Sequence, residues 1–312
     1  MLRIHGPTYR YQNEIINDEI IYIDDHHYNE HTHSFPVAQL LEHNPGNHLL
    51  VFDHLAHDDV LHQYRHVILP VYLAQEVKIF LQQDIHTVWT VKTHCFNFMI
   101  NKPRPNRFIV LDFVEKHKLT NRCYTLPWQK SRWPNIAVTD YRIGNEMVME
   151  SGVKNGSYSN AETYQKLLQK SVFEPTCVSM ITEPCYYERE SMITEKTVMA
   201  IMGGTLPVWV GGWRLPDVMR DLGFDVFDDI VDHSYSTLSC AQDRAQQALI
   251  KNLRLFQDFN YVRDVISNSH DRLMNNLQLI KNNVFLTLVK NQSQANLQLS
   301  SIANLWGLST RC

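Results

Sequence analysis

The sequence has no long apolar run. Nowhere among its 312 residues do about 18 apolar residues follow one another, so a membrane-spanning helix is not expected. Met1 to His5 lead into polar and acidic residues, whereas a signal peptide continues into an apolar segment. We therefore expect a soluble, cytoplasmic protein.

Other absences narrow the class of protein further. The six cysteines are scattered without CxxC spacing, which indicates free thiols in a reducing compartment. The formal net charge is −4 at pH 7, whereas nucleic-acid-binding domains usually carry a basic face. The sequence therefore predicts no nucleic-acid partner.

Glycine and proline are missing from residues 240–299, a stretch rich in Leu, Asn and Gln that is helical in pattern. Histidine is unevenly distributed, with thirteen of the sixteen before residue 100. Together with the chain length, these features predict three parts. They are residues 1–92, residues 93–240 and a helical tail over residues 241–312.

Short apolar runs alternate with amphipathic stretches through the first two parts. The runs are rich in β-branched or aromatic residues and bounded by turn formers, which is typical of buried strands. They span residues 20–23, 49–52, 67–69, 95–100, 122–126, 136–141, 176–181 and 206–210. Helices are predicted over residues 37–43, 60–65, 73–83, 106–118, 159–170 and from about 194. This alternation indicates a mostly parallel sheet covered on both faces.

The segment Thr194-Glu195-Lys196 stands between two of these strands, the first tipped by Glu183 and the second flanked by glycine pairs. Thr194 can cap the following helix, so that Glu195 and Lys196 lie in its first turn. Unpaired backbone N–H groups and the helix dipole favour an anion there, and disfavour a lysine. A bound diphosphate would reverse that penalty, and Glu195 suits a ribose diol. Taken alone, the tripeptide is an ordinary helix cap.

The stretch from Thr176 to Gly212 resembles the donor-binding signature of the α-1,3-fucosyltransferase family and its bacterial and viral relatives. That signature has an acid-tipped strand, a short loop, a Thr-Glu-Lys helix start and a further strand, here Gly203 to Trp209. Leu222 to Tyr235 is similar to a segment of uncharacterised glycosyltransferases of this type. The resemblance implies GDP-fucose or a similar sugar nucleotide as the donor. The sequence departs from the signature at the strand end, where Thr182-Glu183-Pro184 replaces the usual Glu-Asn-Ser.

The resemblance implies an α/β protein of the GT-B type, in which two Rossmann-like domains face each other across a cleft. It implies an inverting, metal-independent glycosyltransferase that needs no cofactor and transfers a sugar to a glycan hydroxyl. By matching positions, Lys196 would pair with the donor diphosphate and Glu195 with the ribose, behind the cap Thr194. Glu183 would lie at the cleft beside the donor, as a candidate catalytic residue.

A basic turn precedes the predicted helix over residues 106–118. It contains Lys102, Arg104 and Arg107, and the family has an arginine-bearing turn that neutralises the donor phosphate. A guanidinium offers a planar fork to phosphate oxygens, so Arg104 or Arg107 is expected to bind the donor. The alternative is a solvated basic turn.

The loop that carries Asp228, Asp229, Asp232 and His233 contains the ligand types that divalent ions prefer. We expect instead that these acids cap a helix beginning near Asp229. No metal is expected, because GT-B enzymes stabilise the leaving phosphate with cations and helix termini.

Acids and histidines also follow the predicted strands of the first part. An inverting transferase needs a carboxylate to deprotonate the acceptor hydroxyl, and the resemblance implies that the N-terminal domain supplies it. Asp24, Asp25 and Asp53 are the candidates. Two alternatives remain open: a non-catalytic glycan-binding or assembly protein on a transferase fold, and a metal-dependent hydrolase that uses the histidine-rich part.

Overall fold

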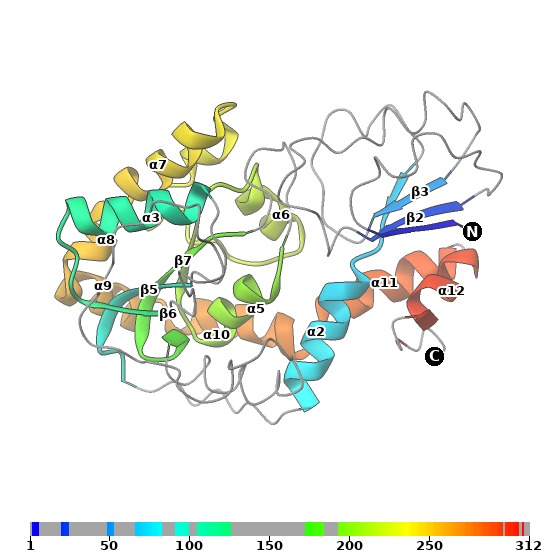
Figure 1. Ribbon diagram of the computed structural model, residues 1–312. Helices are drawn as coiled ribbons and strands as arrows, with labels where there is room; N and C mark the ends of the chain where they lie inside the picture. Colours follow the sequence, from blue (N-terminus) through cyan, green and yellow to red (C-terminus); the bar gives the residue numbers. More distant parts are fainter. Residues whose placement is uncertain are drawn as a thin grey trace, which may run out of the picture.

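The computed structural model describes residues 2–5, 20–24, 49–52, 66–82, 91–99, 105–125, 172–183, 193–295, 297–305 and 308. These residues form two four-stranded sheets in which every paired strand is parallel to its neighbour (Figure 1). The parallel pairing agrees with the strand–helix alternation of the sequence.

The first sheet adds its strands in chain order, β1-β2-β3-β4. They are β1 (Leu2–His5), β2 (Ile20–Asp24), β3 (Leu49–Phe52) and β4 (His66–Ile68). The sequence predicts β2, β3 and β4 to within one residue at each end. It does not reveal β1, because its sequence Leu-Arg-Ile-His alternates apolar and polar residues and lacks the continuous apolar run by which the other strands were recognised.

The second sheet has the strand order β6-β5-β7-β8. Its strands are β5 (His94–Met99), β6 (Arg122–Thr125), β7 (Thr176–Ile181) and β8 (Leu206–Trp209). The chain moves outward from β5 to β6 and then returns to the opposite side of β5 to form β7 and β8. The order therefore reverses between β5 and β7. Open α/β sheets bind their ligands outside the carboxyl ends of the strands at such a switch point.

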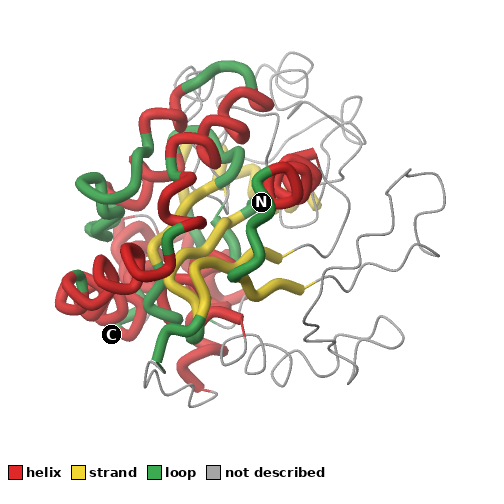
Figure 2. The backbone as a smooth tube through the Cα atoms, turned by 90° about the vertical axis from the view of Figure 1, so that its left-hand side faces the viewer, coloured by secondary structure: helices red, strands yellow, loops and turns green. Residues whose placement is uncertain are grey.

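Four helices follow strands of the two sheets: α2 (Val71–Gln82), α3 (Pro105–Lys116), α5 (Glu195–Met202) and α6 (Leu215–Asp221). Since right-handed crossovers that leave the switch point in opposite directions cover opposite faces, α3 and α5 are expected on different sides of the second sheet. Their buried residues accordingly belong to separate core clusters, with Val110 of α3 in one and Val198 of α5 in the other. Figure 2 shows the helices in red packed along the yellow strands.

The tail is helical, as predicted. It comprises α7 (Ala241–Lys251), α8 (Leu253–Gln257), α9 (Phe259–Asn268), α10 (His270–Lys281), α11 (Val284–Ala295) and α12 (Leu297–Leu305). Ala248 and Phe256 pack in the core on the α3 side, whereas α10 contacts α5. The last two helices lie beside the first sheet (Figure 1), where Ile302 shares a core cluster with Ile20 and Val51. None of the described helices is both long and apolar enough to cross a bilayer.

Three predicted helices, over residues 37–43, 60–65 and 159–170, and the predicted strand over 136–141 lie outside the described residues. The sequence did not predict α6, which has only seven residues and a proline in its first turn. The division into residues 1–92, 93–240 and 241–312 stays a prediction.

Lys92 lies buried at the amino-terminal edge of the second sheet. Its Nζ donates to the carbonyl of Glu174 at 2.9 Å and to that of Gly203 at 2.6 Å. The lysine thus connects the segments that lead into β5, β7 and β8. Burial lowers the pKa of Lys92 to about 8, and a neutral amine still has an N–H group for each carbonyl.

Because of Lys92, stability is expected to rise with pH above about 8. The folded protein releases the lysine proton near pH 8, whereas the unfolded chain holds it to about 10.5. Unfolding therefore takes up a proton between these values, and the free energy of unfolding increases with pH. Between about pH 8 and about pH 9 the wild type should gain about 1 kcal/mol over Lys92→Met in urea denaturation. If the free energy of unfolding changed with pH by the same amount in both proteins, the result would contradict this prediction.

Candidate functional site

The carboxyl ends of β7 and β8 are tied to the start of α3 by one buried side chain, that of Asn106. Its Nδ2 donates to the carbonyl oxygens of Glu183 at 3.0 Å and Val210 at 3.2 Å. Asn106 is fully buried, and Arg107 beside it is 3% exposed. The switch point of the second sheet is thereby flanked by the first turn of α3 and by Glu183.

The carboxylate of Glu183 binds the amino terminus of α5. Its Oε1 accepts from the backbone N–H of Thr194 at 3.0 Å and from Oγ1 of Thr197 at 2.7 Å. Its Oε2 accepts from Oγ1 of Thr194 at 2.5 Å. Glu183 is 1% exposed. An anion is favoured at a helix amino terminus, and in α5 the protein supplies that anion itself.

Thr194 is the N-cap of α5, as predicted. Its backbone is extended, and its Oγ1 accepts from the backbone N–H of Lys196 at 3.4 Å. The cap therefore places Glu195 and Lys196 in the first helical turn, at the carboxyl edge of the second sheet.

The ammonium group of Lys196 lies between two carboxylates. Its Nζ donates to Oε1 of Glu195 at 3.2 Å and to Oγ1 of Thr194 at 3.1 Å, and it lies 3.9 Å from Oε2 of Glu183. Lys196 is 7% exposed. The two acids offset the repulsion between the lysine and the positive end of the helix dipole. From the sequence, we expected a bound diphosphate to relieve this repulsion.

Glu195 links this cluster to the part of the chain that follows the first sheet. Its Oε2 accepts a hydrogen bond of 3.3 Å from the hydroxyl of Tyr72 in α2. Burial, followed by the charges of Glu195 and Glu76, raises the pKa of Tyr72, so the hydroxyl keeps its proton and donates it. The side chain of Glu195 is 26% exposed, against 9% for Lys196 and 1% for Glu183, so of these three it offers most surface to solvent.

Trp209 connects the cluster to the loop after α6. Its Nε1 donates to Oγ1 of Thr197 at 3.0 Å, and its ring centroid lies 5.6 Å from that of His233. The Nε2 of His233 lies 2.8 Å from the carbonyl of Val226 and its Nδ1 lies 3.3 Å from the hydroxyl of Tyr235. Since a carbonyl only accepts, Nε2 carries the proton. Burial lowers the pKa of His233, which favours this neutral ring.

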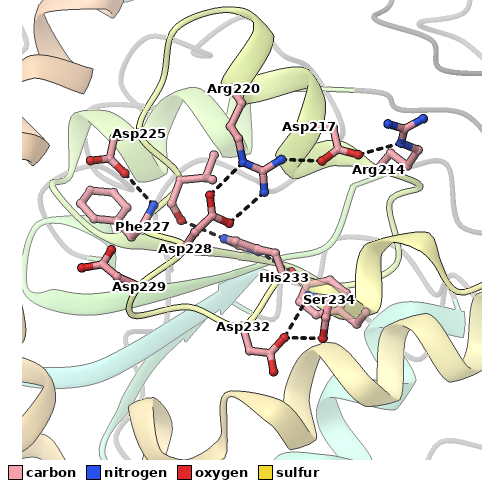
Figure 3. A network of polar contacts seen from close by, with 12 residues as sticks. Arg214, Asp217, Arg220, Asp225, Phe227, Asp228, Asp229, Asp232, His233 and Ser234 are labelled. Carbon is pink, nitrogen blue, oxygen red and sulfur yellow. Dashed lines mark hydrogen bonds and ion pairs between the residues drawn. The ribbon is translucent and has the colours of Figure 1, made fainter.

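His233 also lines a hollow of about 580 Å³. The other lining residues are mostly polar: Asp217, Arg220, Asp228, Asp229, Ile230, Asp232, Ser234, Ser236 and Thr237. Figure 3 shows Asp217 and Asp228 at the guanidinium of Arg220, and Asp232 at the hydroxyl of Ser234. Asp228 lies 2.8 Å from Arg220, and Asp229 lies 2.7 Å from Arg272. Hydrogen bonds from these arginines lower the pKa values of both acids.

The predicted helix near Asp229 is wrong, because residues 228–230 form a turn. Phe227 has a φ of 62°, and its ring lies under the guanidinium of Arg272 at 4.7 Å. Asp228 and Asp229 bind arginines instead of helix N–H groups. Of the three acids, Asp232 accepts from a backbone N–H, that of Ser234 at 2.9 Å. Ser234 is the first residue of the 3₁₀ helix η7 (Ser234–Thr237), whose N-cap is His233. In the described part of the chain, no three His, Cys, Asp or Glu side chains are grouped to hold a metal.

The structure brings together four of the predicted site residues, namely Glu183, Thr194, Glu195 and Lys196. Arg107 lies in the first turn of α3, on the other side of the switch point. Asp24 ends β2, opposite His5 of β1. Arg104, Asp25 and Asp53 lie outside the described residues.

Four residues of the cluster around Glu183 and α5 were not singled out from the sequence: Tyr72, Asn106, Thr197 and Trp209. Asn106 had a weak signal, because a short polar residue directly after a strand-to-helix turn suits a capping role. Tyr72 had none, since its partner Glu195 is 123 positions away. Comparison with protein-family models, curated proteins and solved structures found no match.

Proposed function

We propose that this protein is a glycosyltransferase of the GT-B type that uses a nucleotide diphosphate sugar as donor and a glycan hydroxyl as acceptor. The observation that carries the proposal is the position of Glu195 and Lys196. They lie in the first turn of α5, beside a switch point whose other flank carries Arg107. Two parallel sheets support the two-domain architecture.

Binding of the donor would add partners to both groups. Lys196 donates to Glu195, and both groups are held in place by Glu183 and Tyr72. A ribose diol would donate to the partly exposed Glu195 carboxylate, and a phosphate oxygen would accept a further hydrogen bond from Lys196. Each charge then keeps a partner of opposite charge or a hydrogen-bond donor, which a buried site requires. An acid of the first part would act as the base, and no metal or other cofactor is needed in this scheme.

The proposal is tested by nucleotide-induced thermal shift in EDTA. GDP or UDP in excess over its Kd should raise the Tm of the wild type, because a ligand that binds only the folded state stabilises it. Lys196→Ala should lose this shift. The variant also leaves two acids without their cation, so the shift within each protein is compared, not the absolute Tm. Lys116→Ala, at an exposed position in the last turn of α3, is the matched control and should keep the shift.

A wild type that neither GDP nor UDP stabilises would contradict a sugar-nucleotide site. If a nucleotide binds but mass spectrometry detects neither donor hydrolysis nor transfer to any glycan, a non-catalytic glycan-binding protein is favoured. Stoichiometric zinc, manganese or iron in the purified protein would favour the metal-dependent hydrolase. The histidine-rich segments on which that alternative rests lie mostly outside the described residues.

A further inference from the structure

We propose that Tyr72 is a positioning residue for nucleotide recognition, which fixes the carboxylate of Glu195 from α2. The inference rests on the proposed function. It adds to the nucleotide site a residue of α2, the helix that follows the first sheet. Its basis is the hydrogen bond of 3.3 Å from the Tyr72 hydroxyl to Oε2 of Glu195.

The carboxylate of Glu195 is held from two directions. Tyr72 donates to Oε2, while Lys196 donates to Oε1 at 3.2 Å. With a donor on each oxygen, the plane of the carboxylate is fixed, and a carboxylate oxygen can accept more than one hydrogen bond. A diol needs two acceptor positions at a fixed spacing, so this arrangement would prepare the carboxylate of Glu195, whose side chain is 26% exposed, for a ribose.

Tyr72 can fix the position of Glu195 because α2 is itself fixed by contacts with the helical tail and with the core. The buried amide of Asn283 donates to the carbonyl of Ala74 at 2.9 Å. Leu73, Ala74 and Val77 of α2 are buried in the same core cluster as Val198 of α5. The Tyr72 hydroxyl is therefore carried by a helix whose position is set by both α5 and the tail, and its ring packs against that cluster. A side chain on such a support positions a ligand group better than one on a loop.

The test compares ribonucleotides with their sugar-modified counterparts. Whichever of GDP and UDP binds the wild type is titrated against its 2′,3′-dideoxy form by calorimetry. The wild type should prefer the ribonucleotide by about tenfold or more, as expected for hydrogen bonds to a charged group. Tyr72→Phe should reduce this preference to about threefold or less. Tyr261→Phe, which removes a phenol hydroxyl on α9, is the control and should keep the full preference.

A second variant keeps the Tyr72 hydroxyl and moves its partner. Glu195→Asp retains the charge but withdraws the carboxylate from Tyr72, so it should also lose most of the ribose preference. A purely structural role for Tyr72 predicts a lower Tm in Tyr72→Phe with an unchanged ribonucleotide preference, and that result would overturn the inference alone. A wild type that binds neither nucleotide would overturn the proposed function and this inference together.

Discussion

Replacing Glu183 with alanine should lower the free energy of unfolding by about 3 kcal/mol or more. The substitution removes a carboxylate that is 1% exposed. It leaves the backbone N–H of Thr194 and the hydroxyls of Thr194 and Thr197 without their acceptor. It also removes one of the two acids beside Lys196. Buried donors that lose their acceptor, and a buried charge that loses a partner, are among the costliest changes to a folded chain.

Urea denaturation followed by circular dichroism measures the effect. Glu183→Gln should fall between alanine and the wild type, because the amide oxygen still accepts while the charge is lost. Glu115→Ala, at an exposed position near the end of α3, should change stability by less than about 0.5 kcal/mol. If Glu183→Ala behaves like Glu115→Ala, the carboxylate does not secure the start of α5. The catalytic role that the resemblance gives Glu183 stays a prediction, and the structure adds a role in stability to it.

Replacing Trp209 with alanine should cost about 3 to 5 kcal/mol, as for other large core residues. Trp209 is among the largest fully buried side chains. It joins Thr197 of α5 to His233 of the following loop. Alanine would leave a cavity between β8, α5 and that loop, and the surrounding helices could close it only in part.

A second variant separates the contribution of the indole N–H to stability from that of the aromatic ring. Trp209→Phe keeps an aromatic ring but loses the hydrogen bond to Thr197, whose hydroxyl still binds Glu183. We expect a loss of about 1 kcal/mol from the bond, plus a smaller term for the missing ring volume. Trp213→Phe, on a half-buried neighbour, is the control. Equal losses in Trp209→Phe and Trp209→Ala would show that the hydrogen bond, not the packing, dominates.

Local features of the fold were predictable from the sequence. The boundaries of β7, the cap at Thr194 and the helical tail each depend on neighbours within a few residues. Apolar period and capping chemistry report such neighbours directly. By contrast, β1 was missed because it has no continuous apolar run, and the order of β6-β5-β7-β8 depends on which side the chain returns to after residue 125.

Only the part of the site that depends on neighbouring residues in the sequence was predictable. Glu195 and Lys196 were found because they adjoin a cap and a strand. From the sequence, a bound diphosphate was expected to neutralise Lys196. In the fold, Glu183 and Glu195 already do so. Asp228 and Asp229 were misread for the same reason, since their partners Arg220 and Arg272 come from α6 and α10. Contacts between distant segments leave no periodic signal.

The position of α11 and α12 bears on how the chain folds during synthesis. Asn283 binds Ala74 across 209 positions of sequence, and Ile302 shares a core cluster with Ile20 and Val51. The first sheet is synthesised well before α11 and α12, which supply part of its apolar cover. The contacts that these helices make with the sheet and with α2 can therefore form only after both helices have left the ribosome, and long-range contacts of this kind make folding slow. Packing of the first sheet is thus completed by helices that are synthesised long after it.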